Sequence, residues 1–138
     1  MNAARTLRPP AGGMAPPATA ILPDETRLEL RPLAHAIAEA HFARHPDDLE
    51  RYGEAGVEWC THDNQHLLNW AALDLAGLVD FDEQLQWLAG ILTSRGYPLE
   101  KLADNLRTAA AVVRRDASGE RVQPLADRLA VAADSVGA

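Results

Sequence analysis

The chain has 138 residues, a length that fits one domain with a single core. Hydrophobic residues make up 47% and charged residues 24%, as in ordinary globular domains, while aromatic residues are only 5%, so the predicted core is built from Leu, Ala, Ile and Val. The net charge of −7 argues against nucleic acid or an anionic membrane as a partner, because both attract positively charged surfaces.

The beginning of the chain predicts a leader. Residues 1–23 are rich in Ala, Pro and Gly without periodicity, so we expect a flexible segment ahead of a single domain at residues 24–138. Cys60 is the only cysteine, which excludes an intrachain disulfide, and no apolar run reaches the length of a membrane span. These features predict a cytoplasmic protein that does not contact a membrane.

Five helices are predicted after the leader, and no strand of useful length. The first begins near Asp24 or Pro32 and ends at His45, where Pro46 follows. The others are expected at about residues 48–76, 81–96, 99–115 and 122–136. The second has a plausible break between Tyr52 and Val57, where Gly53 and Gly56 lower helix propensity. The predicted fold is an all-α domain, globin-like or a helical bundle.

The second helix contains the most informative segment, WCTHDNQHLLNW, which runs from Trp59 to Trp70. Six consecutive polar or titratable residues lie inside it, so the helix must turn some of them toward its packed side. One interpretation is internal hydrogen bonding, with Asp63 and Asn64 accepting from tryptophan indoles. The other is a ligand site, whose candidate residues are Trp59, Cys60, His62, Asp63, His66 and Trp70.

Metal binding is one form of that ligand site. His62 and His66 lie four residues apart, hence on one helical face. His41 and His45 form a second such pair. In a simple hairpin around Pro46 the two pairs are offset by about 16 Å along the axis, which excludes a joint site. His41 is therefore interpreted as a core or helix-end histidine.

No motif indicates an enzyme. The chain has no Gly-rich phosphate loop, no G-x-S-x-G motif and no E-x-x-H pair for a di-iron site. Cys60 follows Trp59 in mid-helix, where a thiol is usually inert, and a nucleophilic role would require a pKa well below 8.5. We expect neither catalytic activity nor a bound cofactor.

Two resemblances to known families add to this interpretation. HFARHPDDLERYG, at residues 41–53, resembles the corner between the early helices of bacterial globins. A haem globin also has a downstream proximal His, and no His follows His66 here, so this resemblance implies a globin-like sensor without haem.

The second resemblance spans about 65 residues. It covers Tyr52-Gly53, Cys60, Asp63-Asn64, His66-Leu67 and the turn Arg95-Gly96-x-Pro98. This pattern is similar to a helical region that precedes cobalamin-binding modules in bacterial regulators. The D-x-H-x-x-G motif of the cobalamin module is missing, so the resemblance implies an accessory signalling domain without cobalamin.

Together these observations predict a small non-catalytic sensory, regulatory or protein-interaction domain. A module without an output domain must pass its state to a partner, so we expect a homodimer or a protein partner. The expected docking face lies on the last helix and comprises Val122, Leu125, Leu129 and Val136. The alternative is a domain that binds a small ligand or a metal, a tetrapyrrole included, through the cluster at residues 60–66.

Overall fold

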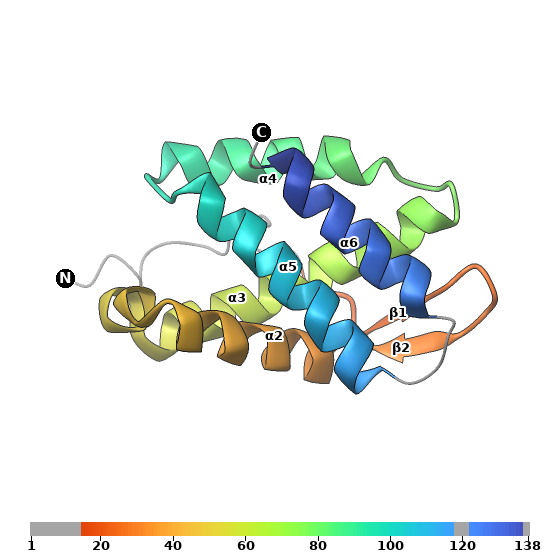
Figure 1. Ribbon diagram of the computed structural model, residues 1–138, viewed down its shortest axis with the longest axis horizontal. Helices are drawn as coiled ribbons and strands as arrows, with labels where there is room; N and C mark the ends of the chain where they lie inside the picture. The colour runs from red at the N-terminus through yellow and green to blue at the C-terminus, as the bar shows by residue number, and fades with distance from the viewer. Residues whose placement is uncertain (1–14, 118–121, 137–138) are drawn as a thin grey trace.

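The computed structural model describes residues 15–117 and 122–136 (Figure 1). Within them, two short strands are followed by five helices: β1 (Thr19–Ile21), β2 (Arg27–Glu29), α2 (Leu30–Arg44), α3 (Pro46–Leu75), α4 (Phe81–Ser94), α5 (Leu99–Asp116) and α6 (Gln123–Val136). The predicted mostly α-helical fold is confirmed. None of the described helices is both long and apolar enough to cross a membrane.

Local chemistry sets the helix ends, which lie close to the predicted ones. Asp80 caps α4, its side chain accepting a hydrogen bond from the amide of Glu83 at 3.2 Å. Gly96, with φ +75°, ends the same helix. Gly53 interrupts α3 at φ 64° and ψ −156°, within the predicted break. Beyond this kink α3 runs on to Leu75 and carries the whole polar segment.

The segment between residues 19 and 29 corrects the prediction of a leader. β1 pairs antiparallel with β2, with Ala20 opposite Leu28. Ala20, Leu22 and Leu28 are buried in the core. Strands of three residues are too short for an alternating pattern to stand out, and alanine is a poor strand signal. Residues 1–14 of the predicted leader lie outside the described part of the chain.

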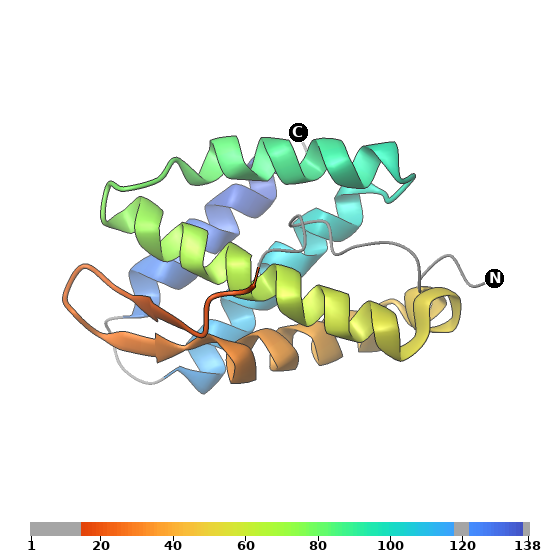
Figure 2. The same cartoon turned by 180° about the vertical axis from the view of Figure 1, so that it is seen from behind.

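The helices pack in two antiparallel pairs, α2 along α3 and α5 along α6, and α5 also crosses α2 (Figures 1 and 2). All five contribute to one core, whose largest side chains are Leu30, Ile37, Leu67, Leu68, Phe81, Leu85, Leu88, Leu106, Val113, Leu125 and Leu129.

The predicted docking face on α6 is wrong. Val122 is 2% exposed, and Leu125 and Leu129 are 0% exposed. Val136 is also packed, partly buried, against the core. The apolar stripe of α6 is used inside the chain, because α6 covers α5 and the end of α3.

Candidate functional site

A cavity of about 130 Å³ lies where the corner between α2 and α3 meets the corner between α4 and α5. Both corners are at the left-hand end of the molecule in Figure 1. Helix α3 lines the cavity through Tyr52, Gly56, Trp59, Asp63 and Leu67, among other residues. An ideal Cβ at Gly56 would lie 2.5 Å from the Cβ of Tyr52 and 3.3 Å from the Phe42 ring, so this position has no room for a side chain.

The exposed surface of the cavity wall is mainly apolar, although polar side chains from α2, α3, α5 and the turn before α5 also line it. The apolar part is Phe42, Tyr52, Trp59, Leu67, Leu88, Leu92 and Leu102. The polar part is His41, Asp48, Cys60, Asp63, Asn64, Arg95, Tyr97, Lys101 and Asn105. A few convergent polar groups in an apolar hollow are typical of small-molecule sites.

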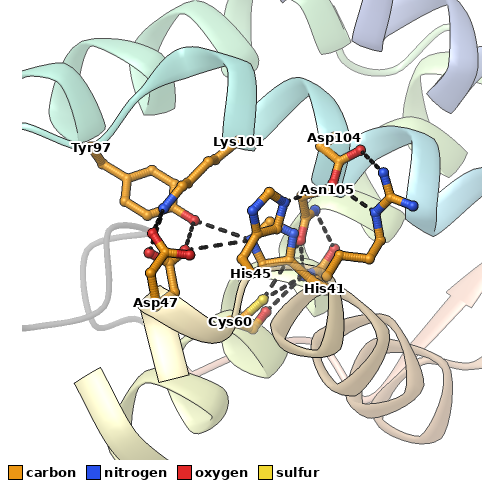
Figure 3. A network of polar contacts seen from close by, with 11 residues as sticks. His41, His45, Asp47, Cys60, Tyr97, Lys101, Asp104 and Asn105 are labelled. Atoms are coloured by element: carbon orange, nitrogen blue, oxygen red, sulfur yellow. Dashed lines mark hydrogen bonds and ion pairs between the residues drawn. The ribbon is translucent and has the colours of Figure 1, made fainter. Parts of the chain in front are cut away.

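Asp48 is the centre of the polar network, although it is only 3% exposed. Its carboxylate accepts a hydrogen bond from the Tyr97 hydroxyl at 2.9 Å and another from the Lys101 ammonium at 2.7 Å. Lys101 also binds Asp47 at 2.7 Å. Figure 3 shows Tyr97 and Lys101 reaching from the start of α5 toward Asp47. A buried charge is tolerated here because it is paired and hydrogen-bonded.

The same network defines the tautomer of His41, which is 2% exposed. Burial and the nearby negative charge of Asp48 raise the pKa of Tyr97. The phenol therefore stays protonated and donates a hydrogen bond to Asp48. The hydroxyl must then accept from His41, whose Nε2 lies 3.1 Å away. Burial lowers the pKa of His41 to about 4, so the ring is neutral at pH 7. Its bare Nδ1 is buried without a hydrogen-bond partner among the described residues.

A second group of charges lies beside His41. His45 Nε2 is 2.8 Å from Asp104 Oδ2, and Arg44 holds the same carboxylate with two hydrogen bonds of 3.0 and 2.9 Å. The Arg44 guanidinium holds the pKa of Asp104 below its usual range. One potential ligand atom each from His41, His45 and Asp104 lies within 4.8 Å of the other two.

Two buried amides connect α3 to α5 at the back of the cavity. Asn64 donates to Asn105 Oδ1 at 3.1 Å, and Asn105 donates to Asn64 Oδ1 at 2.9 Å. The thiol of Cys60 lies 3.6 Å from the same Asn105 oxygen. Desolvation raises the pKa of this thiol, so Cys60 is a neutral wall group and not a ready nucleophile.

The structure divides the predicted ligand-site residues into two sets. Trp59, Cys60 and Asp63 line the cavity. His62, His66 and Trp70 do not; their rings follow one another along α3, with centroids 5.0 and 5.7 Å apart, and Trp70 contacts Trp87 edge-on. The predicted His62–His66 metal pair is not joined by a third ligand in the part of the chain that the structure describes.

Internal hydrogen bonding is confirmed for Thr61, Asn64 and Gln65, but the partner of Asn64 differs from the predicted one. Thr61 donates to the Val57 carbonyl at 2.9 Å, and Gln65 donates to the Pro17 carbonyl at 3.0 Å. Asn64 bonds to Asn105 instead of a tryptophan indole.

Sequence reasoning missed the contribution of α5. Tyr97, Lys101, Asp104 and Asn105 had not been predicted as site residues, nor had Asp48 on α3. One signal was available: Lys101 is the only lysine beside twelve arginines. Its ammonium lies between the carboxylates of Asp47 and Asp48, so this exception in the composition coincides with the polar part of the cavity wall.

Comparison with known proteins finds no matching family model, no matching curated protein and no matching solved structure.

Proposed function

We propose that the chain is a non-catalytic sensory domain that binds a small molecule in the cavity between its two helical corners. The observation that supports this most directly is the cavity itself, with an apolar wall and a polar side. A cavity of about 130 Å³ is close to the size of engineered protein cavities that hold benzene.

The state of the polar groups narrows the class of ligand. Asp48 is hydrogen-bonded to Tyr97 and Lys101, and the Asn64 and Asn105 amides are hydrogen-bonded to each other. A strongly charged ligand would therefore have to break existing hydrogen bonds. A neutral molecule of about the size of a benzene ring, carrying one hydroxyl or similar group, fits these surroundings best. The aromatic wall, with Phe42, Tyr52 and Trp59, favours a planar body.

A non-catalytic role is supported by the protonation states. The thiol of Cys60 and the phenol of Tyr97 both have raised pKa values and stay protonated. Lys101 is held as an ammonium, because its bonds to Asp47 and Asp48 outweigh burial and raise its pKa. None of the three is a ready nucleophile at neutral pH. We further propose that the domain acts in the cytoplasm.

Titration with benzyl alcohol and phenol, followed by NMR of backbone amides, tests the proposal. We expect millimolar or tighter binding, with the largest shifts at Trp59, Cys60 and Tyr97. Leu92→Trp should fill the cavity and weaken binding at least tenfold. Leu78→Trp is the matched control, since Leu78 is 72% exposed and lies outside the cavity. The proposal fails if wild type binds neither compound, or if Leu92→Trp binds both as wild type does.

A further inference from the structure

The three ligand-type side chains beside the cavity have the composition of a metal site. His41 lies in the last turn of α2, His45 ends that helix, and Asp104 comes from α5, 59 residues further along the chain. Their side chains are 2%, 21% and 17% exposed. We infer that His41, His45 and Asp104 bind a divalent transition-metal ion, zinc or cobalt being the best matched by two imidazoles and a carboxylate.

The spacing of the three side chains fits such an ion after small movements. Ligand atoms at about 2.0–2.1 Å from a tetrahedral zinc ion lie about 3.3 Å from one another. His45 Nε2 and Asp104 Oδ2 are 2.8 Å apart, and no pair in the group exceeds 4.8 Å. The two imidazoles are already neighbours, with ring centroids 4.5 Å apart. Three protein ligands leave the fourth tetrahedral position for water or another small ligand.

The hydrogen bonding of His41 supports the assignment. Its Nε2–H group donates a hydrogen bond to the Tyr97 hydroxyl, which in turn donates one to Asp48. Metal-binding histidines are commonly oriented in this way, by a hydrogen bond from the other ring nitrogen that leads to a carboxylate. With Nε2 bound to Tyr97, the other ring nitrogen, Nδ1, is buried and has no hydrogen-bond partner in the described part of the chain. Buried acceptors are rarely left in this state, and a metal ion would supply the missing partner.

Arg44 competes with the proposed ion and makes the inference testable. Its guanidinium holds both oxygens of Asp104, but the Arg44 side chain itself is 62% exposed. If Asp104 is a metal ligand, removal of Arg44 frees the carboxylate and tightens metal binding. If Asp104 serves only as the ion-pair partner of Arg44 and His45, the same change leaves metal affinity unaltered.

Cobalt titration of the untagged protein, read by visible d–d absorbance and by calorimetry, tests the site. Wild type is expected to bind one ion, and zinc should displace it. Asp104→Asn, which keeps the side-chain shape, and His45→Ala should each weaken binding at least tenfold. Arg44→Ala should strengthen it severalfold. His35→Ala is the control, because His35 pairs with Glu39 on the exposed side of α2.

Three results would overturn the inference. One is the absence of cobalt and zinc binding by wild type at millimolar metal. The second is binding that survives in Asp104→Asn and His45→Ala but is lost in His62→Ala with His66→Ala, which would move the site to the α3 pair. The third is an unchanged affinity in Arg44→Ala. Circular dichroism of each variant tests whether the fold is retained. Arg44→Ala changes an exposed side chain, so its result can be interpreted even if a variant of a buried residue unfolds.

Discussion

At the scale of single residues, the reciprocal pair of Asn64 and Asn105 is the most demanding contact of the site. The two side chains are 1% and 6% exposed, and each donates to the other. A buried amide left without its partner costs about 1–3 kcal/mol.

A double-mutant cycle tests how far these amides depend on each other. Asn64→Ala and Asn105→Ala should each lower the free energy of unfolding by about 1–3 kcal/mol, because each strands the other amide. The double variant should lose less than the sum of the single losses, since no amide is then left unpaired. Chemical denaturation measures all four proteins, and strictly additive losses would show that the two amides do not interact.

The sequence predicts such residues only where their own helix makes them conspicuous. Asp63 and Asn64 stand out because they belong to a run of six polar or titratable residues inside a helix. Asn105 and Asp104 lie on α5, whose polar and apolar positions follow an ordinary amphipathic pattern. Their role depends on the side chains that they contact on α2 and α3. The spacing of apolar residues along a helix does not predict such contacts between helices.

At the scale of elements, the kink of α3 at Gly53 directs the polar segment toward α5. Its backbone, φ 64° with ψ −156°, lies in a region that is essentially restricted to glycine. No heavy atom lies within 4 Å of an ideal Cβ at this position, so the constraint comes from the backbone and not from crowding.

Two glycine substitutions separate these effects. Gly53→Ala should lower the free energy of unfolding by about 1–3 kcal/mol through backbone strain. Gly90→Ala is the matched control, because Gly90 lies inside α4, also with open space around it. There alanine should raise the stability by about 0.5–1 kcal/mol. Thermal unfolding of the two variants gives the signs, and a stabilising Gly53→Ala would contradict the kink.

Helix ends could be predicted because short local signals define them. Pro46, Asp80 and Gly96 each act through their own backbone or the next turn, and each lies at the end of a helix in the structure. The hairpin of β1 and β2 has no comparable signal. Ala20 and Leu28 belong to the hydrophobic core, and β1 packs against α2 and α3, which follow it in the chain.

At the scale of the whole molecule, Asp74 joins three helices. From the last turn of α3 it accepts hydrogen bonds from the Phe81 amide at the start of α4, at 2.9 Å, and from Arg128 of α6, at 3.1 Å. Arg128 also contacts Asp82 at 3.2 Å and lies over the Phe81 ring. Burial acts to raise the pKa of Asp74, but the hydrogen bonds from Arg128 and Phe81 outweigh it, and the pKa is lowered.

This junction predicts part of the acid sensitivity of the fold. A carboxyl group whose pKa is lower in the folded than in the unfolded state stabilises the fold fully above the unfolded value, 3.8 for Asp74, and loses this effect as the pH falls further. Asp74→Asn should lower the unfolding free energy at pH 7 by about 1–3 kcal/mol. It should also flatten the loss of stability below about pH 4.

Urea denaturation between pH 2.5 and 7 measures both effects. Asp116→Asn is the control, because Asp116 pairs with its neighbour Arg115 on the surface and should leave the unfolding free energy unchanged. Equal acid profiles for wild type and Asp74→Asn would contradict the role of the junction.

Global packing is also where sequence reasoning went wrong. An apolar stripe on the last helix, here Val122, Leu125 and Leu129, looks the same in the sequence whether it faces a partner protein or the core of its own chain. In the structure it faces the core, because α6 packs against α5. The expected homodimer remains a prediction and would have to use another surface. The resemblances to globin-like sensors and to regions ahead of cobalamin-binding modules likewise remain predictions.

The polar contacts of α5 also limit how that helix can slide. Side chains that reach α2 or α3 follow one another about one helical turn apart, on α5 and just before it: Tyr97, Lys101, Asp104 and Asn105. A shift of one turn, about 5.4 Å, would keep leucines opposite leucines yet separate every one of these partners. These polar contacts therefore fix the register of α5 in a core built mostly of Ala and Leu side chains. A fixed register also preserves the shape of the cavity between the two helical corners.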